Sequence, residues 1–294
     1  MDIAQAVEAP DPSAPDAFVI MAPARQTVPL VVASPHSGSA YPEDFVSAAR
    51  LDRHSLRKSE DCFVDELFAA VPDRGAPLLK ALFPRAYLDA NREPYELDPG
   101  MFSDSLPAWA NSRSPRVAAG LGTIPRVVAN GEDIYRGKLR LADALGRIER
   151  LYRPYHAALA ELVERTRQQF GFCLLLDYHS MPSTGGGYDR SRCDMVLGDC
   201  YGTACAPLAV DTAEQVLRRL GYAVNRNQPY AGGYTTRHYG RPGSGVHALQ
   251  IELNRSLYMD EATLVRRPYF ATLAAHMTEL VEALGALALS AETA

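Results

Sequence analysis

The feature that most constrains the fold is a short apolar run that ends in polar residues, within GFCLLLDYHSMPS at positions 171–183. Residues 172–176 are apolar without a helical period, and the polar residues 177–180, His179 among them, follow directly. A run of this length predicts a buried strand whose carboxyl end is polar. In open α/β sheets ligands bind beyond the carboxyl ends of strands, so a functional site is expected at the end of this run.

Two other stretches repeat this pattern. Residues 29–33 (PLVVA) run into the turn SPHSG, which contains His36, and residues 246–253 (VHALQIEL) carry Glu252 near their end. Because the carboxyl ends of parallel strands meet at one edge of a sheet, we expect both histidines and the carboxylate to lie near one another.

The rest of the chain alternates predicted helices and strands. Helices are expected over 56–70, 140–170 (with a break or kink at Pro154), 206–221 and 260–287, and further strands over 77–83, 86–88, 195–197 and 222–224. Glycine-rich segments over 181–187 and 231–245 are expected to be a turn and a mobile loop, and the irregular residues 95–137 a lid or a wall of a site. The alternation predicts one α/β domain over 26–290 with a mixed, mostly parallel sheet, after a flexible lead-in over 1–25.

Charge and composition limit the possible partners. The net charge of −5 gives no electrostatic footprint for nucleic acid or an anionic membrane, and no apolar run is long enough to span a bilayer. The first residues are acidic and rich in Pro and Ala rather than basic and apolar, so no signal peptide and a cytoplasmic location are expected. The five cysteines are odd in number and form no CxxC pair, which argues against a disulfide framework or a cysteine-based zinc site. The oligomeric state stays open.

The strand-end histidines are of the ligand type found in zinc hydrolases, which use three N or O ligands and leave one position for water. His36 and His179 each lie where a predicted buried strand runs into polar residues. Asp61, at a predicted helix start, is the first choice for the third ligand, with Glu60 and Asp65 as alternatives. We therefore expect a Zn²⁺ site at this edge of the sheet.

Glu252 is expected at the same edge, as a general base. Zinc lowers the pKa of its water to about 7, and a carboxylate beside it accepts the proton during attack on a carbonyl. The alternative is a solvent-facing strand residue, or one in a salt bridge to Arg255.

Arginines in two turns suggest an anionic substrate. Arg92 in DANREP and Arg237 in GGYTTRHYG are expected next to the site, and a guanidinium fork binds a carboxylate bidentately. A structural salt bridge is the alternative for each, and Arg85 is a weaker candidate. In the glycine-rich loop, Tyr234 and His238 are further candidates for contact with substrate.

Other assignments are less favoured. The remaining histidines are expected to be structural or exposed: His54, His156, His247 and His276. The GGG at 185–187 does not belong to a phosphate-binding GxxxxGK[ST] loop, and the absence of GxSxG argues against a serine hydrolase.

Taken in order, the motifs resemble those of the N-formylglutamate amidohydrolase (N-formylglutamate deformylase) family, over roughly 30–265. The motifs are SPHSG (34–38), SEDCFVDELF (59–68), DANREP (89–94), DYHSMPS (177–183), VLGDCYGTAC (196–205) and LQIELNRSLYMDE (249–261). The resemblance implies a three-layer α/β/α fold that is zinc-peptidase-like (phosphorylase/hydrolase-like), akin to zinc carboxypeptidases and aspartoacylases.

The resemblance also implies roles for residues. It implies Zn²⁺ held by His36, His179 and an acid within 60–65, with Glu252 and Arg92 as catalytic residues. By analogy with carboxypeptidases, Asn91 and Arg92 match a carboxylate-binding Asn-Arg pair. The sequence departs from the carboxypeptidase HxxE pattern, because SGS follows His36, and this leaves the acidic ligand open.

The implied reaction is hydrolysis of N-formyl-L-glutamate, or a related N-acyl amino acid, to formate and L-glutamate, the last step of one route of histidine degradation. Arg92 and Arg237 would hold the glutamate carboxylates. Two alternatives remain: a zinc carboxypeptidase or acyl-amino-acid deacylase of a larger substrate, and a non-catalytic binding protein for acidic amino acids. A substrate panel distinguishes the carboxypeptidase or deacylase from the implied deformylase. Metal content, together with mutation of Glu252, distinguishes the binding protein from either enzyme.

Overall fold

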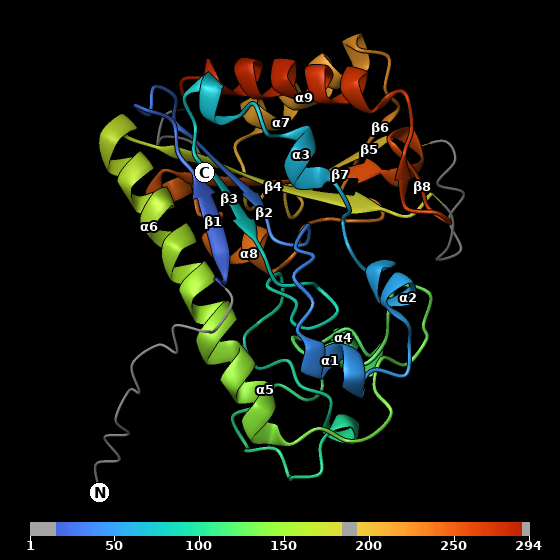
Figure 1. The fold of residues 1–294 in the computed structure, drawn as a ribbon. Coiled ribbons are helices and arrows are strands. Elements are labelled where there is room, and N and C mark those ends of the chain that lie inside the picture. The colour runs from blue at the N-terminus through green and yellow to red at the C-terminus, as the bar shows by residue number, and fades with distance from the viewer. Residues whose placement is uncertain (1–15, 184–192, 290–294) are drawn as a thin grey trace, which may run out of the picture.

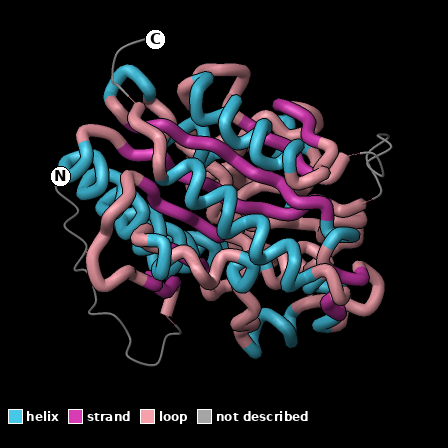
Figure 2. The backbone as a smooth tube through the Cα atoms, turned by 90° about the horizontal axis from the view of Figure 1, so that it is seen from above, coloured by secondary structure: helices cyan, strands magenta, loops and turns pink. Residues whose placement is uncertain are grey.

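A seven-stranded sheet forms the centre of the computed structural model, which describes residues 16–183 and 193–289 (Figures 1 and 2). The strands lie in the order β1-β3-β2-β4-β7-β5-β6. Their bounds are β1 Phe18–Met21, β2 Leu30–Ser34, β3 Leu78–Ala81, β4 Cys173–Met181, β5 Met195–Gly198, β6 Val224–Arg226 and β7 Val246–Asn254. Neighbours among β3, β2, β4 and β7 run parallel, as do β5 and β6, whereas β1 is antiparallel to β3 and β5 to β7. The prediction of a mixed, mostly parallel sheet is therefore confirmed.

Helices cover both faces of this sheet. On one face lie α3 (Val64–Leu67), α7 (Pro207–Arg219) and α9 (Phe270–Gly285), and the other is covered by α5 (Leu141–Arg147) and α6 (Arg153–Phe170) (Figure 1). The central strand β4 supplies both layers, because its alternate side chains face opposite ways. Leu174 and Leu176 pack into the first apolar cluster, Cys173 and Leu175 into the second. The predicted three-layer α/β/α arrangement is confirmed.

Short elements surround the carboxyl edge of the parallel strands. They are α1 (Glu43–Ala48), α2 (Arg53–Arg57), α4 (Pro115–Ala118), α8 (Tyr234–Tyr239) and the hairpin of β8 (Met259–Asp260) and β9 (Val265–Arg266). The connection over 95–137 is mostly irregular, as expected, and Figure 1 shows α1, α2 and α4 gathered on the side of the sheet away from α7 and α9.

The prediction of one helix over 56–70 is wrong, and the irregular segment found in its place forms part of the site. The first helix ends at Arg57 and the next begins at Val64, with an irregular segment between them. Phe63 has a left-handed backbone (φ 65°), which a continuous helix does not allow. The amide of Asp61 donates instead to the carbonyl of His36 at 3.0 Å, so a tertiary contact overrides local helix preference.

Other boundaries also differ from the predictions. Residues 86–88 form a turn, in which the amide of Leu88 donates to the carbonyl of Pro84, rather than a strand. The polar residues 177–180 lie inside β4, not in a turn after it. The loop expected over 231–245 contains α8, and the last helix begins at residue 270 because the β8–β9 hairpin occupies 259–266.

The N-terminal expectation also changes. Strand β1 falls within the segment expected to be a flexible lead-in, 1–25, and pairs with β3 at the sheet edge. The helix over 140–170 is present, with a π-helical turn over 148–152 immediately before Pro154. The glycine-rich turn expected over 181–187 lies largely outside the described residues. Within the described ranges, no helix combines the length and apolarity needed to cross a membrane.

Candidate metal centre

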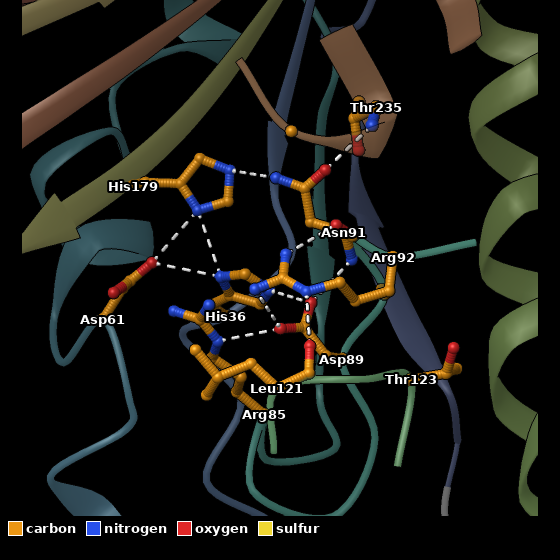
Figure 3. A network of polar contacts seen from close by, with 12 residues as sticks. His36, Asp61, Arg85, Asp89, Asn91, Arg92, Leu121, Thr123, His179 and Thr235 are labelled. Carbon is orange, nitrogen blue, oxygen red and sulfur yellow. Dashed lines mark hydrogen bonds and ion pairs between the residues drawn. The ribbon is translucent and has the colours of Figure 1, made fainter. Parts of the chain in front are cut away.

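Three side chains from different parts of the chain converge at the carboxyl edge of the sheet. His36 follows β2, His179 lies near the end of β4, and Asp61 comes from the segment between α2 and α3. The two Nδ1 atoms are 3.1 Å apart, and Oδ2 of Asp61 lies 3.4 Å from Nδ1 of His36 and 3.2 Å from Nδ1 of His179 (Figure 3). All three residues are at most 3% exposed.

A second carboxylate lies behind each imidazole. Nε2 of His36 is 2.8 Å from Oδ1 of Asp89, and Nε2 of His179 is 3.0 Å from Oδ2 of Asp177. A carboxylate is acceptor-only, so each Nε2 carries the proton and donates it outward. Both Nδ1 lone pairs are then directed at the same point as the Asp61 oxygen. Carboxylate–histidine pairs of this kind orient the ligands in zinc sites.

The electrostatics of this centre favour a cation. Burial by itself raises the pKa of Asp61, but the hydrogen bonds and charges of the two histidines hold that pKa well below its usual range. Burial likewise lowers the pKa of His179, yet Asp177 and Asp61 together raise it well above its usual range. Since the same carboxylates stabilise any positive charge at this position, a divalent ion can take the place of the proton. The donor set therefore fits Zn²⁺.

Hydrogen bonds fix the Asp61 carboxylate in this position. Its Oδ1 accepts from Oγ of Ser180 and from Nη2 of Arg255, each at 3.1 Å. The two alternative ligands point elsewhere. Glu60 accepts from the Tyr41 hydroxyl at 2.6 Å and from Arg57, and Asp65 pairs with Lys80 at 2.9 Å.

The centre opens into a cavity of about 640 Å³. His36 and His179 line it, together with Asn91, Arg92 and Glu252, and part of its wall comes from residues 116–131 of the long connection. The connection thus forms a wall of the site.

Glu252 lies beside His179 in the sheet. The two residues are register partners on β7 and β4, and Nε2 of Gln250 donates to Oε1 of Glu252 at 2.9 Å. Burial raises the pKa of Glu252 to about 7, and the negative charge of Asp61 adds to this shift. The group is therefore able to exchange a proton near neutral pH, and a bound cation would return its pKa toward the usual range.

Asn91 and Arg92 lie on the cavity wall but have structural partners too. The side-chain amide of Asn91 lies 3.0 Å from Nε2 of His179, and its Oδ1 accepts from the backbone amide of Thr235 (Figure 3). Arg92 donates from Nε to the carbonyl of Leu121 and from Nη1 to the carbonyl of Asn91, both at 2.8 Å. With the proton of His179 on Nε2, Nδ2 of Asn91 donates instead to Oδ2 of Asp177 at 3.4 Å, so Asn91 packs against the carboxylate partner of a candidate ligand. Arg92 keeps part of its guanidinium toward the cavity.

The three candidates from the glycine-rich segment are placed differently. Tyr234 and His238 stack on each other, 4.8 Å between ring centroids, and neither lines the cavity. Arg237 is exposed, and its Nη1 lies 3.5 Å from the carbonyl of Gly232, a cavity residue. The structure brings Arg237 near the rim, whereas the two aromatic rings are not among the residues that line the cavity.

Several functional candidates were missed from the sequence: Asp89, Asp177, Ser180, Gln250, Arg255 and Arg116. A usable signal existed for Asp177 and for Gln250, which precede His179 and Glu252 by two residues and so share their faces of β4 and β7. The others depend on contacts between distant segments.

Fold and site together define an α/β protein with a buried two-histidine, one-carboxylate centre at the carboxyl edge of a mixed sheet. Residues 28–259 match the family model described as N-formylglutamate amidohydrolase. The chain therefore belongs to the N-formylglutamate amidohydrolase family.

Individual relatives agree with this assignment. The chain is 29% identical to an N-formylglutamate deformylase of Pseudomonas putida, over 80% of this chain and 83% of that one. It is 31% identical to the protein of that name from Pseudomonas aeruginosa, over 81% and 84%. Its structure is similar to the crystal structure of N-formylglutamate amidohydrolase from Ralstonia eutropha, with a TM-score of 0.85 and 40% identity over 92% of this chain and 97% of that one.

Proposed function

We propose that this chain is a zinc-dependent amidohydrolase that hydrolyses N-formyl-L-glutamate to formate and L-glutamate. The observation that carries the proposal is the convergence of His36, Asp61 and His179 at the wall of a cavity that Glu252 also lines. Membership of the family and the names of its relatives supply the substrate.

His36 and His179 through Nδ1, and Asp61 through Oδ2, would hold the metal. Zinc in such a site supplies Lewis-acid polarisation of a carbonyl and a lowered pKa for water. Asp89 and Asp177 keep the two imidazoles in the tautomer that presents Nδ1, and Arg255 with Ser180 keeps the carboxylate of Asp61 in place.

Glu252 would move the proton. Its carboxylate accepts a proton from the attacking water and returns it to the nitrogen of the leaving amine, as a general base and then a general acid. Gln250 holds Oε1 of Glu252, which restricts the carboxylate to the wall next to His179. Burial keeps bulk water from competing for this proton.

Arg92 would bind the α-carboxylate of the substrate. The residue is 8% exposed and lines the cavity next to Asn91. The hydrogen bonds to the carbonyls of Asn91 and Leu121 fix its plane, so little side-chain entropy remains to be lost on binding.

The direct test is formate release from N-formyl-L-glutamate by purified protein. We expect activity that is lost after a chelator removes metal and returns with added zinc. A panel of N-acyl amino acids and peptides with a free carboxyl end distinguishes a deformylase from a deacylase or carboxypeptidase of larger substrates. Binding of acidic amino acids without hydrolysis of any substrate in the panel would contradict the proposal.

A further inference from the structure

Arginine side chains gather on the side of the cavity formed by the long connection, and they differ in how well they are paired. Arg85 and Arg92 both face Asp89, with nitrogen–oxygen distances of 3.0 and 3.4 Å to its Oδ2 (Figure 3). Arg116 has only a long ion pair, 3.9 Å to Glu96, and Arg237 has no carboxylate partner among the residues the structure describes. Because of this difference in pairing, we expect Arg116 and Arg237 to have another function than Arg85 and Arg92.

Arg116 is the clearest case. It lines the cavity from α4, and its side chain is 27% exposed. Its one ion pair in the described ranges is to Glu96, whose Oε2 lies 3.9 Å from Nη1, and its guanidinium makes no hydrogen bond there. That same oxygen of Glu96 already accepts from the backbone amide of Glu93. A half-buried arginine side chain is thus left with its guanidinium donors unbonded to any of the described residues.

The surroundings of Arg116 also favour an additional negative charge. Burial lowers its pKa, and the neighbouring positive charge of Arg237 lowers it further, ahead of the opposing effect of Glu96. Arg237 in turn is exposed, with only a 3.5 Å contact from Nη1 to the carbonyl of Gly232. An anion bound beside Arg116 on the cavity wall would offset the repulsion from Arg237 near the rim.

The position of Arg116 is tied to that of Arg92. The carbonyl of Arg116 accepts from the amide of Leu121 at 2.8 Å, and the carbonyl of Leu121 accepts from Nε of Arg92 at 2.8 Å. The backbone turn that carries Arg116 is therefore fixed to the guanidinium that we assign to the α-carboxylate. A rigid link of this kind sets the separation of two anion-binding groups.

We propose that Arg116, with Arg237 beside it, forms a subsite for the side-chain carboxylate of the substrate, so that the protein selects N-acyl amino acids with an acidic side chain. The inference rests on the proposed function, because it assigns Arg92 to the α-carboxylate and extends that site by a second anion position. A guanidinium fork accepts a carboxylate through two parallel hydrogen bonds, and a neutral amide at the same position leaves those donors unpaired.

The first test measures binding, without turnover. Calorimetric titration of the zinc-loaded protein with L-glutamate and with L-glutamine compares ligands of equal shape that differ in the distal carboxylate. We expect the wild type to prefer L-glutamate, and Arg116→Gln to reduce that preference at least about tenfold. Arg116→Lys keeps the charge without the fork and should fall between the two.

The matched control is Arg113→Ala, an exposed arginine on the same segment that does not line the cavity. It should keep the wild-type preference. An unchanged preference in both Arg116 variants, or a wild type that binds the two amino acids equally, would overturn the subsite.

The second test is the ratio of kcat/KM for N-formyl-L-glutamate over N-formyl-L-glutamine, which should fall at least about tenfold in Arg116→Gln. Formate release with an unchanged ratio would refute the subsite and leave the proposed function standing. A protein that releases no formate from either compound, but shows the predicted binding preference, would refute the proposed function and support the subsite.

Discussion

Replacement of Asp177 by asparagine isolates the contribution of a carboxylate that is not among the proposed metal ligands. Oδ2 of Asp177 lies 3.0 Å from Nε2 of His179, and the residue is fully buried. Asparagine keeps the size but removes the charge that stabilises the imidazole as a ligand. Loss of such an outer partner weakens metal binding 10- to 100-fold, or about 1.4 to 2.8 kcal/mol. Competition with a fluorescent zinc chelator measures this change directly.

Thermal unfolding separates this role from a purely structural one. Excess zinc stabilises a folded protein by RT ln(1 + [Zn]/Kd), so the zinc-dependent rise in Tm should be smaller in Asp177→Asn than in the wild type. The metal-free variant should also lose some stability, because Oδ2 of Asp177 pairs with the buried imidazole of His179, so the zinc-dependent part of the Tm is the informative quantity. Asp211→Asn, at an exposed ion pair with Arg226, is the control. An unchanged zinc Kd in Asp177→Asn would refute the reasoning.

Three further substitutions test other parts of the site. Glu252→Gln keeps size and hydrogen bonding but cannot accept a proton, so turnover should fall at least about a hundredfold with zinc content intact; loss of zinc would instead make Glu252 a ligand. Arg92→Lys keeps the charge without the fork and should weaken substrate binding by about 2 kcal/mol in steady-state kinetics, and unchanged kinetics would make Arg92 structural. Gly233→Ala would place a Cβ against Nδ2 of Asn91, so we expect Asn91 to be displaced from Asp177, which holds His179. The zinc affinity, measured by chelator competition, should then fall about tenfold or more, and a wild-type affinity would show that Asn91 does not position the Asp177–His179 pair.

The strand pattern carried most of what the sequence could predict. Apolar runs ending at polar residues placed His36, His179 and Glu252 near one edge, because the carboxyl ends of parallel strands meet there. Alternation within β4 also explains why Asp177 and His179 face the same way. These features depend on local pattern and on a general rule of sheet topology.

The rest depends on contacts between distant segments. The choice of Asp61 over its acidic neighbours could not be made from composition, because it follows from a left-handed residue at 63 and a backbone bond to His36. Tyr234 and His238 were expected to contact the substrate. They lie instead on the short helix α8, where their rings stack on each other. The weak pairing of Arg116 likewise could not be predicted from the sequence, because it depends on how α4 packs against the cavity.

We propose that His36, Asp61 and His179 hold one zinc ion at the wall of the cavity that Glu252 lines. The decisive experiment is diffraction from a crystal of the purified protein on both sides of the zinc absorption edge. We expect one strong anomalous peak bounded by Nδ1 of both histidines and by Oδ2 of Asp61. A zinc-replete, active protein with no peak at this position, or with its peak at another set of side chains, would contradict it.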